Sequence, residues 1–313
     1  MATDATTTRV RSGVAAPTKA SRFGRRDNRD GYLFLAPWLF GLIVLTVGPM
    51  IASLYLSFTN YQVLIPPVWV GIGNYERMFT RDPLFWRSLS STVYYVAGSV
   101  PIRLGIALLL AMLLNLSYKG SYFFRVIFFL PSVTSGVAVA TVWLWMFHRE
   151  FGVINNMLAW FRIPGPPWLG SLDWAMPSII VMSFIYIGHM MVVFLAGLQG
   201  IPRHLYEAAE IDGAGTLRRF RNITLPMLSP TIFFNLVMTV ISSFQVFVNV
   251  YIMTRGGPAQ STYVYMIYLY DQAFRYVHMG YASALAWVLF LIILFITVVQ
   301  VLTSGWVYYE GGR

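Results

Sequence analysis

Apolar residues in this chain are gathered into runs long enough to cross a membrane, with short polar segments between them. No Asp, Glu, Lys or Arg occurs in residues 31–75, 174–202, 222–254 or 276–309. A membrane-spanning α-helix needs about 20 predominantly apolar residues. The pattern therefore predicts an all-α polytopic membrane protein with six transmembrane helices, at about 32–58, 88–115, 124–147, 174–198, 230–253 and 280–306.

The polar segments divide the chain into a tail and a membrane domain. Residues 1–31 are basic and poor in large apolar side chains, which is typical of a disordered segment. The first apolar run begins near Tyr32 and is longer than the apolar core of a signal peptide. We therefore expect this run to remain as an anchor and residues 32–313 to form the transmembrane domain.

The distribution of positive charge predicts the orientation. With the N-terminus inside, the tail, the turn at 116–125, the segment at 199–229 and the C-terminus carry fourteen Lys and Arg residues. The loops on the other side carry seven. Cytoplasmic segments of membrane proteins are enriched in Lys and Arg. The sequence therefore predicts that both termini are cytoplasmic, and it explains the net charge of +10 without nucleic-acid binding.

The chemistry that the sequence lacks excludes several classes of activity. There is no cysteine, and all twelve acidic residues lie outside the six predicted helices. Neither lysine, Lys19 or Lys119, lies in a phosphate-binding loop, and no acid pair, metal cluster or catalytic triad stands out. We expect no enzyme activity, no cofactor and no metal. An ion-coupled carrier is disfavoured because such carriers usually need an intramembrane carboxylate.

Two predicted helices carry polar side chains at helical spacing. One face of the fifth holds Asn235, Thr239, Ser242, Gln245 and Asn249, and one face of the fourth holds Met182, Tyr186 and His189. Polar groups are costly in hydrocarbon, so these faces should meet protein or a wet cavity. They either join packed helices or line a substrate path, which their matching depth favours. Arg103, inside the second helix, either pairs with backbone carbonyls or a carboxylate of another subunit, which we favour, or attracts an anionic substrate group.

The densest charge lies in the segment YEAAEIDGAG, from Tyr206 to Gly215. Pro202 suits the first turn of a helix, and Gly213 and Gly215 favour its end. This helix is too short and too charged to cross a bilayer. We expect it at the cytoplasmic surface between the fourth and fifth spans, either as a docking element or as an ordinary solvated helix.

The spacing of this segment resembles a known family. Glu207-Ala208-Ala209, then Gly213, then Ile223-x-Leu225-Pro226 is similar to the "EAA" signature of permease subunits of bacterial ATP-binding-cassette importers. The segments at 73–79, 123–133, 254–262 and 271–284 resemble the carbohydrate-importer branch of these binding-protein-dependent inner-membrane components. The resemblance covers nearly the whole chain from about residue 30.

This resemblance implies a subunit of an ATP-driven importer that forms half of the path for a sugar or oligosaccharide. The helix at 202–215 would be a coupling helix, with ATPase contacts at Tyr206, Glu207, Ala208, Ala209, Asp212 and Gly213. The implied partners are a second homologous permease, two cytoplasmic ATP-binding subunits, an extracytoplasmic solute-binding protein and membrane lipid, without nucleic acid. The implied location is the bacterial cytoplasmic (inner) membrane, with residues 32–313 as the permease domain.

The resemblance also places substrate contacts on the helices that flank the coupling segment. Carried over, they fall at Met182, Ile185, Tyr186, His189, Ser242, Ser243 and Val246, and Gln245 and Asn249 of the polar face complete the predicted site. Hydroxyl, amide and aromatic groups suit a neutral polyol. Arg103 and His189 keep a glycerol-3-phosphate importer open as the alternative. A secondary carrier and a membrane-bound enzyme are the alternatives from other classes.

Overall fold

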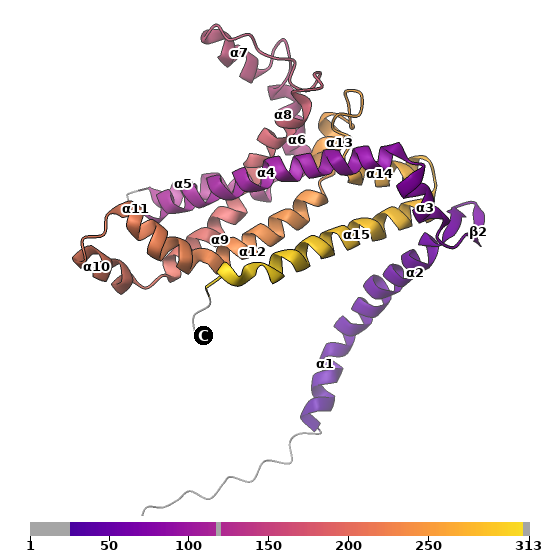
Figure 1. Ribbon diagram of the computed structural model, residues 1–313, viewed down its shortest axis with the longest axis horizontal. Helices are drawn as coiled ribbons and strands as arrows, with labels where there is room; N and C mark the ends of the chain where they lie inside the picture. The colour runs from indigo at the N-terminus through magenta and orange to yellow at the C-terminus, as the bar shows by residue number, and fades with distance from the viewer. Residues whose placement is uncertain (1–25, 117–119, 309–313) are drawn as a thin grey trace, which may run out of the picture. The chain divides into compact units, whose positions relative to one another are not determined.

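The computed structural model of the chain describes residues 26–116 and 120–308 (Figure 1). Almost all of them are helical. The α-helices are α1 (Arg26–Leu42), α2 (Gly48–Ser57), α3 (Gly73–Thr80), α4 (Pro83–Asn115), α5 (Ser121–Phe129), α6 (Gly136–Met146), α7 (Val153–Trp160), α8 (Ala175–Ser183), α9 (Ile187–Gly200), α10 (Arg203–Ile211), α11 (Thr216–Arg219), α12 (Leu225–Phe244), α13 (Val248–Met253), α14 (Tyr265–Tyr270) and α15 (Met279–Leu302).

Short helical turns and one hairpin complete the structure. The π-helical or 3-10 turns are η2 (Ile43–Val47), η3 (Leu130–Val133), η4 (Phe184–Tyr186), η5 (Phe220–Thr224), η6 (Asp271–Arg275) and η7 (Ser304–Trp306). The strands β1 (Thr59–Gln62) and β2 (Ile65–Trp69) pair antiparallel, with Thr59 opposite Trp69 and Gln62 opposite Ile65. This hairpin is the one departure from the predicted all-α class within the described residues.

The prediction of a polytopic helical membrane protein is confirmed. Among the described residues, five helical stretches are long and apolar enough to cross a membrane: Gly31–Ser57, Pro83–Asn115, Ala175–Gly200, Thr216–Phe244 and Met279–Trp306. A sixth span results if Ser121–Val133 and Gly136–Met146, which meet at an angle of 100°, are one broken helix.

Two compact units make up the chain, residues 1–52 and 53–313. In the first unit, helix α1 begins at Arg26, inside the range predicted for the tail. Residues 26–30 contain no Pro or Gly that would end a helix before the apolar run. The rest of the predicted tail, residues 1–25, lies outside the described residues.

In the second unit, α4 packs against both α9 and α12. Ala107 and Ala111 of α4 are fully buried in a cluster with Met191 and Phe194 of α9 and Leu228 of α12. Small side chains at these positions let the helix backbones approach closely, as is usual between helices in a membrane. A larger cluster joins α4 to α8, α12, α14 and α15.

Three of the predicted helices are interrupted where the sequence pattern predicts continuous helix. Pro131 lies in η3, and Thr134 and Ser135 are extended (ψ 146° and 128°), so α5 and α6 form a sharp bend. The 3-10 turn η4 separates α8 from α9. The fifth predicted helix, at 230–253, starts earlier and stops at Phe244, because Phe247 leaves the helical region (φ −137°) before α13.

Asp82 joins three elements at the start of α4. Its Oδ1 accepts hydrogen bonds from the backbone N–H groups of Leu84 (3.0 Å) and Phe85 (3.3 Å), which caps the helix. Its Oδ2 accepts hydrogen bonds from the hydroxyl of Tyr268 on α14 and from that of Tyr281 on α15, the latter at 2.5 Å. One carboxylate therefore holds α4, α14 and α15 together.

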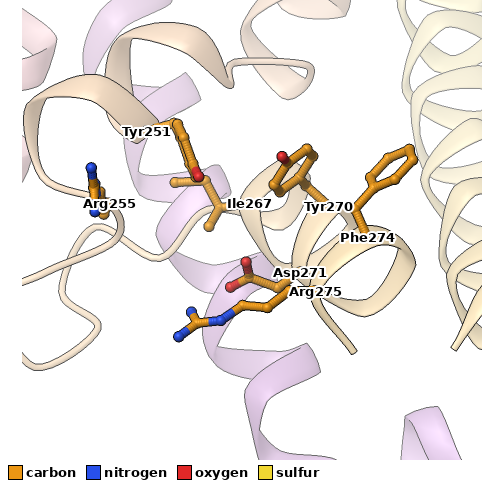
Figure 2. A pocket seen from close by; sticks show the side chains of 7 residues that line it. All are labelled: Tyr251, Arg255, Ile267, Tyr270, Asp271, Phe274 and Arg275. Carbon is orange, nitrogen blue, oxygen red and sulfur yellow. The ribbon is translucent and has the colours of Figure 1, made fainter. Parts of the chain in front are cut away.

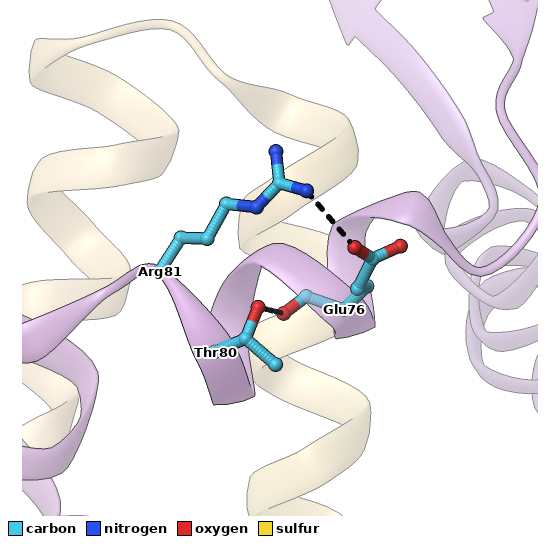
Figure 3. Close-up of polar contacts among 3 residues, drawn as sticks. All are labelled: Glu76, Thr80 and Arg81. Atoms are coloured by element: carbon cyan, nitrogen blue, oxygen red, sulfur yellow. Dashed lines mark hydrogen bonds and ion pairs between the residues drawn. The ribbon is translucent and has the colours of Figure 1, made fainter.

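Just before this cap, the end of α3 carries an exposed ion pair (Figure 3). Arg81 Nη2 donates to Glu76 Oε1 at 3.1 Å, and the Thr80 hydroxyl donates to the Glu76 carbonyl at 2.7 Å. The side chains of Arg81 and Glu76 are 76% and 55% exposed. Solvent screening makes such pairs weak contributors to stability.

Candidate substrate path and coupling helix

The three helix interruptions lie next to one another in the interior of the second unit. The turns η3 and η4 contact each other, and α13 packs against both α6 and α8. The Tyr186 hydroxyl donates to Asn249 Oδ1 at 3.4 Å. Gly136, the first residue of α6, lies against both groups: an added Cβ would be 3.6 Å from the Tyr186 hydroxyl and 3.7 Å from Asn249 Oδ1.

Such a junction of broken helices suits a binding site within a membrane. Interrupted helices leave backbone N–H and C=O groups without their regular partners, which is tolerated only inside protein or beside a wet cavity. Many transporters bind their cargo at discontinuous helices for this reason. At the junction the backbones of α9 and α5 approach each other closely at Gly188. An added Cβ there would lie 2.2 Å from the Phe128 carbonyl oxygen.

The structure brings together some of the predicted substrate residues and separates others. Tyr186 and Asn249 are half-buried and paired, and His189 and Ser242 are exposed. Gln245 lines a mostly apolar groove with Met266 and Leu269, and neither Tyr186 nor Asn249 lines it. The helix breaks between Gln245 and Asn249, so the two residues are not one regular helical turn apart.

Met182 differs from its predicted position on the path. Its side chain is fully buried and packs in a cluster with Val139 and Ala140 of α6, Phe147 and Met253. Tyr186 is the last residue of the 3-10 turn η4, so Met182 and Tyr186 are not one regular α-helical turn apart. The Met182 side chain therefore belongs to the apolar core next to the junction.

Arg103 has no acidic partner among the residues that the structure describes. Its Nη1 donates to the buried Ser243 Oγ at 3.5 Å, and its Nε is buried without a hydrogen-bond partner in the described part of the chain. Among the described residues, ion pairs form between Arg81 and Glu76 and between Arg219 and Glu210, and neither involves Arg103. Tyr186 lies within electrostatic range of its guanidinium.

The sequence pattern gave no sign that Arg103 and Ser243 meet, because they come from helices 140 positions apart in the chain. Their contact brings the guanidinium to the end of α12, and the charge also interacts with Tyr186. An intramembrane charge without a counter-ion is costly and marks a functional site by default.

The helix α10 follows the end of α9 that is far from the junction, and it ends in a well-defined C-cap. The Ala214 N–H donates to the Ala209 carbonyl at 2.8 Å, and the Gly213 N–H donates to the Glu210 carbonyl at 3.0 Å. This pair of bonds is the Schellman motif, which needs a left-handed residue at the position of Gly213 (φ +73°). The expected end of this helix at Gly213 agrees with the structure.

The two faces of α10 differ in what they meet. Leu205 and Tyr206 pack against the cluster around α9, and the Tyr206 and Thr224 hydroxyls lie 3.0 Å apart. Tyr206 therefore contacts its own chain, since its position one turn after Pro202 turns it toward α9. The exposed face carries Glu207, Ala208 and Asp212, and the exposed Ile211 (87%) and Leu217 (79%) lie at its end and in α11.

Comparison with known proteins decides the family. The model of the family "Binding-protein-dependent transport system inner membrane component" matches residues 103–307, about two thirds of the chain. The chain belongs to this family. This permease is 46% identical to the probable ABC transporter permease protein YesP of Bacillus subtilis (strain 168), over 94% of the chain and 96% of YesP.

A second relative and a solved structure are also subunits of transport systems. The permease is 37% identical to the lactose transport system permease protein LacF of Rhizobium radiobacter, covering 91% of this chain and 97% of LacF. It superposes with a TM-score of 0.80 and 25% identity on a bacterial alginate ABC transporter in complex with an alginate pentasaccharide-bound periplasmic protein, over 91% of this chain and 98% of that chain. The resemblance to importer permeases is confirmed, and these subunits are not enzymes.

Proposed function

We propose that this permease forms half of the translocation path of an ATP-driven importer for a sugar or oligosaccharide. The observation that carries the proposal is the link between two features: the exposed face of α10 and the helix junction around Tyr186 and Asn249. Both adjoin α12, the exposed helix α10 through Thr224 at its start and the junction through Ser243 at its end. The cargo class follows from relatives that transport lactose and alginate.

We propose that three kinds of protein partner assemble with this permease. The exposed face of α10, with Glu207, Ala208 and Ile211, would dock on a cytoplasmic ATPase, and a second homologous permease would close the path. Two ATPases would drive alternation between inward- and outward-facing states, because their binding energy differs between those states. A solute-binding protein would deliver the cargo on the other side, with the tail (1–31) and both termini in the cytoplasm of a bacterial cell.

The proposed substrate site is the junction itself. Tyr186, His189, Ser242 and Asn249 would contact the cargo through hydroxyl, imidazole and amide groups, and Ser243 would hold Arg103 in place. A sugar offers hydroxyls to such groups and apolar C–H faces to the Tyr186 ring. Tyr186 and Asn249 are the pair that a ligand would engage first, because their mutual hydrogen bond is long at 3.4 Å and readily exchanged.

The main test is assembly and energy dependence. The tagged permease is purified in mild detergent, and co-purifying proteins are identified by mass spectrometry; uptake is then measured in vesicles with and without ATP. We expect a P-loop ATPase and a second permease, both lost when residues 203–213 are scrambled, and ATP-dependent uptake. Uptake without ATP and without an ATPase would support an ion-coupled secondary carrier instead.

The charge of the cargo is the second question, since relatives import both lactose and the acidic polysaccharide alginate. Replacing Arg103 with Gln removes the unpaired charge beside the junction and retains a hydrogen-bond donor. An acidic or phosphorylated cargo, including glycerol-3-phosphate, should lose at least about tenfold in transport, the value of one charge-assisted contact. A neutral sugar should lose little. Equal losses for a neutral and an anionic cargo would rule out a role for Arg103 in charge selection.

A further inference from the structure

A polar cavity lies away from the Tyr186–Asn249 junction, beyond the other end of α13. It has a volume of about 340 Å³ and is lined by Tyr251, Arg255, Ile267, Tyr270, Asp271, Phe274 and Arg275. Figure 2 shows that these side chains come from α13 and the loop after it on one side, and from α14 and η6 on the other. The volume lies within the range of about 300–1,000 Å³ that small-molecule sites occupy.

Aromatic rings form one part of the wall. Tyr270 is the centre of this group: its ring centroid lies 5.0 Å from that of Phe247, 5.5 Å from that of Tyr251 and 5.2 Å from that of Phe274. These contacts hold the rings in place. Phe274 is nevertheless exposed, and Tyr251 and Tyr270 are only half-buried. The cluster therefore offers ring surface to a ligand at little cost in side-chain entropy.

Charged groups form the other part. Asp271 is 7% exposed, and its Oδ2 accepts a hydrogen bond from the Tyr263 hydroxyl at 2.7 Å. Burial, and after it the Asp271 carboxylate, raises the pKa of Tyr263, so the phenol remains a donor. Arg255 and Arg275 are exposed, and neither forms one of the ion pairs between described residues.

Together these groups suit a sugar ring better than a purely apolar or purely ionic ligand. A pyranose has one apolar C–H face, which matches an aromatic ring, and a rim of hydroxyls. Guanidinium groups donate to hydroxyl or carboxylate oxygens, and a carboxylate accepts from hydroxyls. The cavity presents all three kinds of group around one space.

The position of the cavity relates it to the path. Tyr251 lies two residues after Asn249 on the same short helix, a rise of about 3 Å. The other lining residues belong to the loop at 254–279 and its helices, which we assign to the extracytoplasmic side. A ligand leaving this cavity would reach the junction by passing α13.

We propose that this cavity is a carbohydrate subsite at the outer mouth of the path, where one pyranose unit of the cargo stacks on Tyr270 and is held by Arg255, Asp271 and Arg275 before it enters the junction. The inference rests on the proposed function and deepens it. It implies that this permease itself, and not only a delivering protein, selects the ring that enters first.

Saturation-transfer NMR on the full-length permease in lipid nanodiscs tests this subsite. The probes are methyl β-glucopyranoside, methyl β-galactopyranoside and methyl β-glucuronide, at millimolar concentration. We expect transfer to the ring C–H protons of at least one probe. The signal should fall about fivefold in Tyr270→Leu and persist in Tyr270→Phe, since the ring and not the hydroxyl makes the contact.

Further variants distinguish this subsite from binding elsewhere on the permease. Arg275→Gln and Arg255→Asn alter exposed positions, and Asn tolerates the left-handed backbone of Arg255 (φ 50°); each should also weaken transfer. Tyr94→Leu is the matched control, an exposed tyrosine (53%) of α4 outside the cavity. Asn249→Ala reports on the junction: any transfer that it removes arises from binding there and not in this cavity.

Three results would overturn the inference. One is the absence of transfer to all three probes. Another is transfer that survives Tyr270→Leu and Arg275→Gln but is lost in Asn249→Ala, which would place the binding at the junction and leave the proposed function standing. The third is transfer that is unchanged in Tyr270→Leu and Arg275→Gln although a solute-binding protein no longer stimulates uptake by these variants. That result would make this face a protein contact. Failure of the proposed function would be seen separately, as uptake without ATP.

Discussion

The two ends of the second unit are built in opposite ways. One end holds α10 and α11, and the other holds α3, α14 and the start of α15; Figure 1 shows them at opposite ends of the long helices α4 and α12. At the second end, Asp82, Tyr268 and Tyr281 join three helices through hydrogen bonds. At the first end, Ile211 and Leu217 are almost fully exposed, and α10 is held to its own chain mainly through Leu205 and Tyr206.

The difference lies in what the charged groups meet. The network around Asp82 pairs its carboxylate with two tyrosine hydroxyls and two backbone N–H groups of the same chain. Exposed Ile and Leu side chains on a charged helix are the reverse: they cost free energy in water and gain it when a partner covers them. The comparison predicts that changes near Asp82 affect stability, whereas changes near Gly213 affect transport.

The largest effect is expected for Asp82→Ala. The substitution removes the cap of α4 and leaves the hydroxyls of Tyr268 and Tyr281 without their acceptor. Losses of about 1 kcal/mol for the cap and 1–3 kcal/mol for each orphaned hydroxyl add to roughly 3 kcal/mol or more. Thermal unfolding in detergent, followed by size-exclusion chromatography, measures it. Asp82→Asn keeps an acceptor and should lose less; equal stability of all three proteins would contradict the described network.

The next effect concerns transport rather than stability. Gly213→Pro places a residue with φ near −65° where the backbone has φ +73°, and removes the N–H that bonds to the Glu210 carbonyl. Uptake should fall at least about tenfold, which corresponds to 1.4 kcal/mol, while membrane insertion and melting temperature stay near normal. Gly213→Asn is the control, because Asn tolerates the left-handed region. Normal uptake in the proline variant would remove the coupling role of α10.

A smaller effect is expected for Tyr206→Phe. The variant keeps the ring against α9 and removes only the hydroxyl contact with Thr224, worth about 1 kcal/mol. ATP-dependent uptake should fall about fivefold, because α10 is less firmly held to the helix that carries its movement. Thr224→Val removes the same contact from the other side, and the double variant should be no worse than either single one. Additive losses would mean that the two hydroxyls act separately.

The smallest effect is expected for Arg81→Ala, near Asp82 in sequence but exposed. Its pair with Glu76 should contribute no more than about 0.5 kcal/mol. Melting curves in low and high salt check this, since salt screens an exposed pair. A loss as large as that of Asp82→Ala would break the distinction between a buried network and exposed surface at this end.

The sequence pattern was informative where one physical rule dominates. Apolar runs locate Met279–Leu302 and the end of α4 at Asn115 within a few residues, because burial in lipid selects on hydrophobicity alone. The end of α10 at Gly213 was predictable because only a few residues accept a left-handed backbone.

The same pattern could not reveal the interruptions. Residues 184–186 and 245–247 are as apolar as their neighbours apart from Gln245, so hydropathy runs through both breaks. The pairing of Tyr186 with Asn249 lies beside those breaks, and Met182 and Gln245 do not lie with it on one continuous helical face. Contacts such as Tyr281 with Asp82, separated by 199 positions, require the tertiary fold.

The helical stretch from Thr216 to Phe244 contains the π-helical turn η5 and Pro230, and α12 is its longest regular part. The 20 residues of α12 span about 30 Å. One end receives α10 through the Tyr206–Thr224 contact, and the other ends at Ser243 and Phe244, beside Arg103 and the break that leads to Asn249. We therefore expect a displacement of α10 to reach the junction through α12, where the break before α13 allows these two helices to change their relative tilt.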